Sequence, residues 1–294
     1  MRWYFRTSSL VRCSYDPEPG DAGQANVNPD LFVKCEAPSH QSATAMIKGL
    51  VRRALDRQGY VLWKRDFMRF GNDPWLDVNR LSRAWGKAIL TVFDVGANDG
   101  ATLVEMLPAF PVATVHSFEP LRETFERLKA RVSDPRAQLH NLALGEICGP
   151  VPFYVYGSQG DGSLMNSLTP DAGFARRGGW EPKIVEVQSL TLDAFCESEK
   201  IDRIDVLKMD TEGFDLAVLR GSERMLREAR VDFVYLEFND LLDREGIAGG
   251  SLLPISQFLG NLGLRYVTTY TDFVQTDGPM WVCANALFAR DPRA

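Results

Sequence analysis

Histidine is scarce in this sequence, long apolar runs are absent, and positive charge is not in excess. The 294 residues include 3 histidines and carry a formal net charge of −6 at pH 7. The acidic balance gives no overall basic field for a nucleic-acid partner. No segment approaches the ~18 apolar residues that a membrane-spanning helix needs. The sequence therefore predicts a soluble protein with no transmembrane segment and no nucleic-acid partner, and it leaves the oligomeric state open.

Cysteine is also sparse, and its spacing excludes two common uses. There is no C-x-x-C pair and no histidine at zinc-ligand spacing, so a structural zinc site is not expected. The number of cysteines is odd and they lie far apart, which favours reduced thiols and a cytoplasmic location over a disulfide framework. The five are Cys13, Cys35, Cys148, Cys196 and Cys283.

Residues 1–45 differ in composition from the rest of the chain. The stretch 16–43 is rich in Pro, Gly, Asn and Ser and shows no apolar periodicity, which is typical of a disordered segment. The run that begins at Met46 is itself a credible chain start, so translation from Met1 and from near Met46 both stay open. We expect the leader to be dispensable for folding.

Residues 46–90 are predicted to form a helical segment. Apolar residues at 47, 50, 51, 54 and 55 share one helical face, and basic residues occupy the rest. A basic amphipathic helix can lie on a membrane surface. We favour a helix docked on the core, because the apolar face has no bulky aromatic residues.

From residue 91 to about 290, apolar strand-like runs alternate with helical patterns. This alternation predicts an α/β fold with a mostly parallel sheet flanked by helices. Between 151 and 190 the rhythm breaks into two strand-like runs around a polar loop, which predicts a hairpin insertion. The strands of the main sheet are expected at 92–97, 113–118, 138–143, 204–209, 231–238, 264–269 and 281–288.

The first of these strands ends in the sequence VFDVGANDG. A dinucleotide site places a glycine where the backbone must approach a diphosphate, and here that place holds Asn98, between Gly96 and Gly100. Asn tolerates the left-handed backbone that such a turn requires. A nucleoside without phosphates, such as S-adenosylmethionine, needs no such close approach. The buried carboxylate of Asp94 favours its ammonium or sulfonium and would repel a diphosphate.

Two further residues are candidates for binding this cofactor. Glu119 ends the second strand, 19 residues past Gly100, where a carboxylate can accept hydrogen bonds from both ribose hydroxyls. Its alternative role is to complement the dipole of the following helix. Asn141 follows the third strand and could lie on the adenine side or could satisfy loop backbone. Asp94 could likewise cap a helix or pair with a cation.

Carboxylates dominate the ends of the fourth and fifth strands. The fourth strand ends in Lys208-Met-Asp210-Thr-Glu212, and Glu237 comes near the end of the fifth. Crowded carboxylates raise one another's pKa, so a member of this cluster could act as a base near neutral pH, with Lys208 moderating the charge. We assign no role to His116 or His140, which fall within strands.

Five motifs in register resemble the FkbM-type S-adenosylmethionine-dependent methyltransferases. They are FDVGANDG, SFEP, NLALGE, VQSLTLDAF and IDVLKMDTEGFDLAVLRG, and the similarity runs from about residue 53 to 288. The resemblance implies a seven-stranded class I methyltransferase (Rossmann-like) fold with a final antiparallel strand at 281–288. It also implies O-methylation of a hydroxyl on a sugar, glycan or secondary metabolite. A catalytically silent cofactor-binding or scaffold domain of the same fold is the alternative.

A metal-dependent mechanism is a second use of the same acids. Asp210 with Glu237 or Asn239 offers oxygen ligands of the kind that Mg²⁺ takes, as in catechol-type O-methyltransferases. Those enzymes have a lysine three positions after the first acid, where this sequence has Gly213. We therefore favour a metal-free carboxylate base. The acceptor is expected to enter over the loop at 157–183, where Arg176, Arg177 and Trp180 could hold a sugar or an acidic group.

Overall fold

The chain divides into two units, Met1–Met68 and Arg69–Ala294. The computed structural model describes residues 51, 54–55, 57–58, 68–156, 166–168, 181–238, 252–275 and 281–292. In the first unit Val51, Ala54, Leu55 and Arg57 are helical, in agreement with the apolar spacing there. The leader at 1–45, the docking of the 46–90 segment and the domain boundary at 91 stay predictions.

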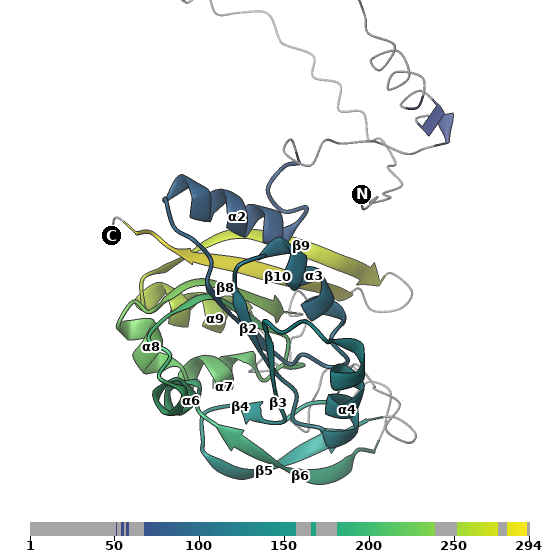
Figure 1. The fold of residues 1–294 in the computed structure, drawn as a ribbon, viewed down its shortest axis with the longest axis vertical. Helices are drawn as coiled ribbons and strands as arrows, with labels where there is room; N and C mark the ends of the chain where they lie inside the picture. Colours follow the sequence, from purple (N-terminus) through teal and green to yellow (C-terminus); the bar gives the residue numbers. More distant parts are fainter. Residues whose placement is uncertain are drawn as a thin grey trace, which may run out of the picture. The chain divides into compact units, whose positions relative to one another are not determined.

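Seven strands of the second unit form one mixed sheet, in the order β3-β2-β1-β7-β8-β10-β9. Five of them pair in parallel, and β10 is antiparallel to both of its neighbours. The predicted α/β fold with a final antiparallel strand is therefore confirmed (Figure 1). The bounds are β1 Thr91–Val95, β2 Thr114–Phe118, β3 Ala137–His140, β7 Ile204–Met209, β8 Val231–Phe238, β9 Leu264–Gln275 and β10 Trp281–Arg290.

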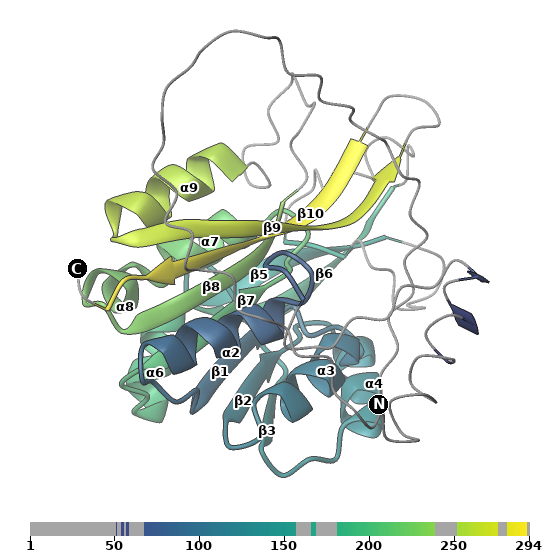
Figure 2. The same ribbon diagram turned by 90° about the horizontal axis from the view of Figure 1, so that it is seen from above.

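Helices cover both faces of this sheet, and each face has its own core. Apolar residues of α2, α3 and α4 pack on one face, and those of α6 to α9 pack on the other (Figure 2). Strand β1 shows why, because Val92 points into the first core and Phe93 into the second. The bounds are α2 Pro74–Ala84, α3 Ala101–Ala109, α4 Arg122–Arg131, α6 Leu192–Glu199, α7 Asp215–Arg220, α8 Glu223–Arg227 and α9 Leu252–Asn261.

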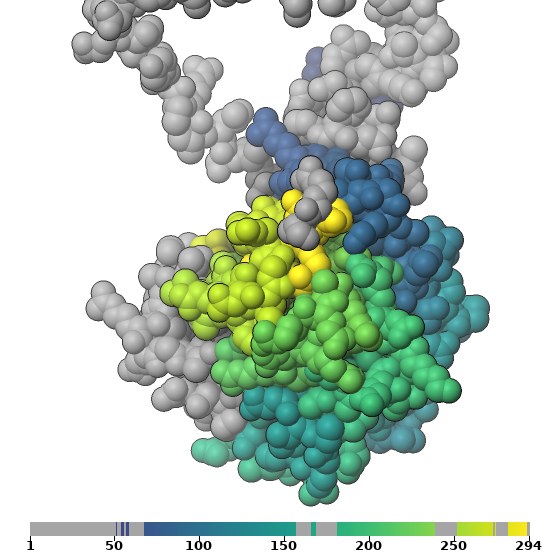
Figure 3. Space-filling model, turned by 90° about the vertical axis from the view of Figure 1, so that its left-hand side faces the viewer, coloured from purple at the N-terminus to yellow at the C-terminus, as the bar shows by residue number. Residues whose placement is uncertain are grey.

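Figure 3 shows the later part of the chain, in green and yellow-green, as one closely packed surface. The helices that flank the sheet are short. Across the described ranges, none of the helices combines the length and the apolar character that crossing a bilayer requires. In helix α4, Phe125 and Leu128 are buried and Leu121 stands at the N-cap.

The predicted hairpin insertion forms a second, smaller sheet. Strands β5 (Gly149–Val155) and β6 (Lys183–Leu190) pair in an antiparallel hairpin, and β4 (Ala143–Leu144) adds to β6 in parallel. A separate apolar cluster, which includes Val151, Phe153 and Val187, fills the space beneath it. The insertion therefore has a core of its own beside the carboxyl ends of the main strands.

Candidate cofactor pocket and acid cluster

The turn after β1 brings two strand ends into direct contact. Gly96, Asn98 and Gly100 all have positive φ angles, of 75°, 48° and 86°. A Cβ atom on Gly96 would lie 1.9 Å from the carbonyl oxygen of Asp210, so only glycine fits there. Asn98 adopts the left-handed conformation that the sequence pattern favours. The turn thus places the end of β1 against the end of β7.

Glu119 stands at the end of β2 and is held by two backbone groups. Its Oε2 accepts a hydrogen bond from the Asn98 amide at 3.1 Å, and its Oε1 accepts one from the Leu121 amide at 2.9 Å. Burial raises the pKa of Glu119 to about 7, although both hydrogen bonds oppose the rise. Each oxygen has a further lone pair, so the carboxylate can still accept hydrogen bonds from a ligand.

Asp94 and Lys208 form a buried ion pair between neighbouring strands. Lys208 Nζ lies 2.9 Å from Asp94 Oδ1 and donates to the Gly96 carbonyl at 3.2 Å. Burial opposes the charge on Lys208, but the carboxylates of Asp94 and Asp210 outweigh it and raise the pKa of Lys208. Asp94 Oδ2 has no hydrogen-bond partner in the described part of the chain. The pair fixes the lysine directly beneath the turn after β1.

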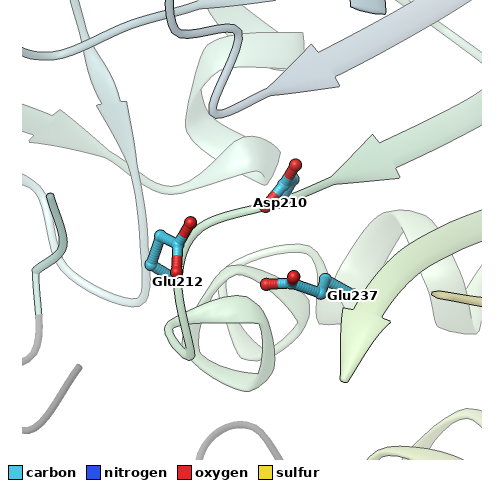
Figure 4. Close-up of side chains that lie close together, drawn as sticks. All are labelled: Asp210, Glu212 and Glu237. Carbon is cyan, nitrogen blue, oxygen red and sulfur yellow. The ribbon is translucent and has the colours of Figure 1, made fainter. Parts of the chain in front are cut away.

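Three carboxylates meet beyond the ends of β7 and β8. One carboxylate oxygen from each of Asp210, Glu212 and Glu237 lies within 4.8 Å of the other two. Figure 4 shows Asp210 and Glu212 on the stretch that follows β7, with Glu237 beside them on β8. We call these three residues the acid cluster. Its nearest described cation is Lys208, whose Nζ lies 3.8 Å from Asp210 Oδ2.

The acid cluster and its surroundings hold protons at neutral pH. Burial, and then the charge of Glu237, raises the pKa of Glu212 well above its usual value. Burial, and then the charge of Asp210, raises the pKa of Glu237 to about 8 and that of Asp215 to about 7. Cys283 Sγ also lies 2.7 Å from Glu237 Oε1 and can donate to it. The cluster is therefore only partly ionised near pH 7.

A pocket that is partly open to solvent runs along these strand ends. Its polar lining residues include Asn98, Glu119, Asp210 and Glu212. Its apolar lining residues include Leu142, Ala143 and Leu144 after β3, Phe153 and Leu168 of the insertion, and Phe214 after β7. This mixed lining suits a small ligand that has both polar and apolar parts.

Half of the predicted site residues line this pocket. Gly96, Asn98, Glu119, Asp210 and Glu212 lie in its wall. The wall does not include the other predicted residues that the structure describes, which are Asp94, Gly100, Asn141, Lys208 and Glu237. Glu237 lies beside Asp210 and Glu212, which do line the pocket. Gly100 instead caps α3, and a side chain there would meet Leu128 at 2.7 Å.

Asp94 and Asn141 make contacts that match the alternative roles in the sequence, and their contact with a cofactor stays a prediction. Asp94 is fully buried and paired with Lys208. Asn141 Nδ2 donates to the carbonyls of Glu119 at 2.9 Å and Pro120 at 2.8 Å. Asn141 therefore holds the segment that carries Glu119. Asn239, Arg176, Arg177 and Trp180 lie outside the described residues.

The two strand histidines form a core pair. The rings of His116 and His140 stack, with Nδ1 of the first 3.2 Å from Nε2 of the second. Burial lowers the pKa of His140 to about 4, so it is neutral at pH 7. Both rings pack against Phe195, on the face covered by α6. This packing agrees with leaving both histidines out of the candidate site.

Sequence reasoning did not single out three residues that matter to this site. Asp215 is fully buried, five positions after Asp210 in the same acidic run, and that run was the signal that could have identified it. Phe214 lies in the pocket wall between them. Ser167 contacts the backbone after β7 from the insertion, and no local pattern indicates such a long-range contact.

The strand order and the strand-end pocket are those of a nucleoside-binding α/β domain. A family model described as the methyltransferase FkbM domain matches residues 94–266, more than half of the chain. The chain therefore belongs to the FkbM methyltransferase family.

Two curated relatives extend this comparison. The chain is 25% identical over 155 residues to 2-O-methyltransferase NoeI of Sinorhizobium fredii, which covers 51% of this chain and 63% of the relative. It is 27% identical over 171 residues to hexuronic acid methyltransferase AglP of Haloferax volcanii, which covers 58% and 65%. The chain thus spans less than two thirds of the length of each relative.

Solved structures show weaker likenesses. Magnesium protoporphyrin IX methyltransferase of Synechocystis, solved with bound SAM, has a TM-score of 0.39 at 11% identity and covers 83% of this chain and 97% of its own. N-methyltransferase NodS of Bradyrhizobium japonicum has a TM-score of 0.38 at 12% identity and covers 74% and 93%. The fold assignment rests on the strand order of this chain and not on these scores.

Proposed function

We propose that the chain is an S-adenosylmethionine-dependent O-methyltransferase that acts on a hydroxyl group of a sugar or glycan. The observation that carries the proposal is that Glu119 and the acids Asp210 and Glu212 line one pocket in a chain of the FkbM family. The two curated relatives are a 2-O-methyltransferase and a hexuronic acid methyltransferase. They support oxygen as the acceptor atom and a sugar as the acceptor class.

The residues of the pocket suit S-adenosylmethionine. Glu119 would accept hydrogen bonds from the hydroxyls of the ribose, and the apolar lining residues of the pocket would hold the adenine ring. The Asp210 carboxylate would repel a diphosphate. When bound, this cofactor supplies a methyl group on a positively charged sulfur. The pocket therefore favours this cofactor over a nicotinamide dinucleotide.

Asp210 is our candidate for the base that removes the acceptor's proton. An alcohol is a poor nucleophile until a base takes its proton. The Asp210 side chain is 40% exposed and lies in the pocket wall, so a sugar hydroxyl can reach it. Lys208, fixed by Asp94, lies 3.8 Å away and stabilises negative charge there. Glu212 and Glu237 would exchange the proton onward within the acid cluster.

We further propose that the reaction needs no divalent cation. Glu237 Oε1 already lies 2.7 Å from Cys283 Sγ, which can donate a hydrogen bond to it. Lys208 already places one positive charge beside Asp210. EDTA should therefore leave turnover unchanged. Loss of turnover with EDTA and its return with Mg²⁺ would make the acid cluster a ligand set instead.

A transfer assay with the full chain tests the function. The chain, radiolabelled S-adenosylmethionine and a panel of neutral sugars, hexuronic acids and their glycosides are mixed, and S-adenosylhomocysteine release is measured. We expect release that depends on one class of sugar and that Asp210→Asn suppresses. Cofactor binding without release on any hydroxyl acceptor would favour a catalytically silent domain.

A further inference from the structure

Ser167 joins the small sheet to the stretch that carries two of the acids. We call residues 210–213 the acid turn. The Ser167 hydroxyl oxygen lies 3.1 Å from the carbonyl of Thr211 and 3.0 Å from the carbonyl of Glu212. A hydroxyl has a single proton, so Ser167 shares one donor between two acceptors. The residue is only 1% exposed, so water does not compete for these carbonyls.

The backbone of Ser167 is held on the insertion side. The Tyr154 amide donates to the Ser167 carbonyl at 2.8 Å, and the Ser167 amide donates back to Tyr154 at 3.1 Å. Next to it, Asn166 Oδ1 accepts from the Tyr156 amide at 2.9 Å. These bonds fix the segment 166–168 to β5 and its neighbouring residues. The Ser167 hydroxyl therefore extends from a rigid support.

The acid turn that Ser167 holds has a strained backbone. Glu212 has a φ of 54° and Gly213 a φ of 90°. A left-handed conformation at a residue other than glycine costs on the order of 1 kcal/mol and persists when its surroundings stabilise it. Backbone hydrogen bonds hold the turn at its two ends, from the Asp210 amide to the Val95 carbonyl and from the Phe214 amide to the Thr211 carbonyl. Ser167 supplies the contacts in the middle.

We propose that Ser167 is a positioning residue that holds the acid turn so that Asp210 and Glu212 stay in the pocket wall. Its neighbours Asn166 and Leu168 line the same pocket, so one short segment shapes the wall and fixes the acids. The catalytic consequence rests on the proposed methyltransferase function. The structural consequence, a loosened acid turn without the hydroxyl, does not.

Ser222 provides a matched control. It is fully buried, and its hydroxyl donates to the Leu219 carbonyl at 2.8 Å, away from the pocket wall. Ser167→Ala and Ser222→Ala each remove one buried hydroxyl. The first takes a donor from two carbonyls, and the second takes one from the Leu219 carbonyl, which keeps the Ser222 amide at 3.1 Å. Ser222→Ala therefore shows the effect of losing a buried hydroxyl away from the pocket, whereas a positioning effect should be confined to Ser167→Ala.

Amide hydrogen exchange of the ligand-free full chain gives the first test. We expect Ser167→Ala to speed exchange at least several-fold in peptides that span 209–215. The lost hydrogen bond makes local opening of the acid turn more favourable, and the exchange rate rises with the population of the open form. Ser222→Ala should leave these peptides unchanged. Equal exchange in Ser167→Ala and the unsubstituted chain would overturn the proposal, whatever the function of the protein.

The pH profile of turnover gives the second test. A loosened turn lets the carboxylates separate, so Ser167→Ala should lower turnover roughly tenfold and shift the titrating limb to lower pH. Ser222→Ala should keep the original profile. A Ser167→Ala profile that superposes on the original would contradict the positioning role. An unsubstituted chain that transfers no methyl group contradicts the proposed function alone, because the exchange result stands apart from it.

Discussion

The two ends of β7 and β8 carry acids in opposite electrostatic settings. At the start of these strands, Asp232 is bonded to Lys87 at 2.8 Å and to Arg203 at 3.1 Å. Asp205 accepts from the amides of Leu90 at 2.6 Å and Thr91 at 2.8 Å. Both of these acids have a cation or backbone donors. The same two strands end in an acid cluster whose nearest described cation is Lys208, which is already paired with Asp94.

This difference separates charges that support the fold from charges available for chemistry. Removing a buried carboxylate from its cationic partners lowers the free energy of unfolding. A buried carboxylate that is crowded by other carboxylates itself lowers the free energy of unfolding, and it holds a proton at a higher pH than usual. In the described part of β7 and β8, the crowded arrangement lies at the pocket end of the strands. Substitutions at the two ends should therefore affect different measurements.

The largest expected effect is on turnover, at Asp210. Asp210→Asn keeps the shape of the side chain but removes the base, so turnover should fall by roughly 10²–10⁴ while cofactor affinity stays within a few fold. Steady-state kinetics and a binding titration measure the two quantities separately. Turnover within a few fold of the original would transfer the role of base to Glu212.

The next effect is on cofactor affinity, at Glu119. Hydrogen bonds to a charged carboxylate contribute roughly 1.5–3 kcal/mol each, so Glu119→Ala should weaken S-adenosylmethionine binding by about tenfold to several hundredfold. Glu119→Gln is the matched control, because it keeps the shape and part of the hydrogen bonding. Unchanged affinity in Glu119→Ala would remove this residue from the binding site.

At the paired end the effect should be on stability. Asp232→Asn removes the acidic partner of Lys87 and one of the two acidic partners of Arg203, which keeps Asp205 at 3.7 Å. The free energy of unfolding should fall by about 2 kcal/mol. Asp210→Asn should change it by less than about 0.5 kcal/mol or raise it, because it relieves repulsion. Urea unfolding of both variants tests the contrast directly. Similar losses in the two variants would remove the distinction between the two ends.

Stability should also fall as the pH rises from about 5 to about 8. The folded-state pKa values of Glu237, Asp215 and Glu119, about 8, 7 and 7, are all raised. The folded chain therefore binds more protons than the unfolded chain in this window. The loss should be about 1–2 kcal/mol after allowance for solvent access. Glu237→Gln should flatten the profile, and a rise in stability with pH would contradict the raised pKa values.

The smallest effect is expected outside both strand ends, in the leader. Deletion of residues 1–43 should leave the melting temperature and the cofactor affinity unchanged, because the composition of that segment cannot form a core. Limited proteolysis of the full chain should trim the same segment. A clear fall in melting temperature on deletion would show that the leader contributes to the fold.

Residue patterns predicted the parts of the site that depend on strand ends alone. Apolar runs located the seven strands, and the carboxyl ends of parallel strands meet at one edge, so Glu119, Asp210, Glu212 and Glu237 could be placed near one another. The left-handed turn at Asn98 followed from its flanking glycines. These features are local, or they follow from the general geometry of the α/β fold.

The remaining features depend on register and on long-range pairing. Asp94 and Lys208 face each other because β1 and β7 pair with these residues side by side, and the sequence does not specify that register. Strand β4 has two residues, which is too short for an alternating pattern that would predict its pairing with β6. Ser167 reaches the acid turn over more than 40 positions of the chain. Such contacts arise from tertiary packing and not from local pattern.

The most direct test of the account is a calorimetric titration of the full chain with S-adenosylmethionine and, separately, with NAD. We predict one binding site for S-adenosylmethionine, weakened in Glu119→Ala and retained in Asp232→Asn under conditions where that variant is folded, and no binding of NAD. Binding of NAD, or S-adenosylmethionine binding that Glu119→Ala leaves intact, would contradict the assignment of this pocket.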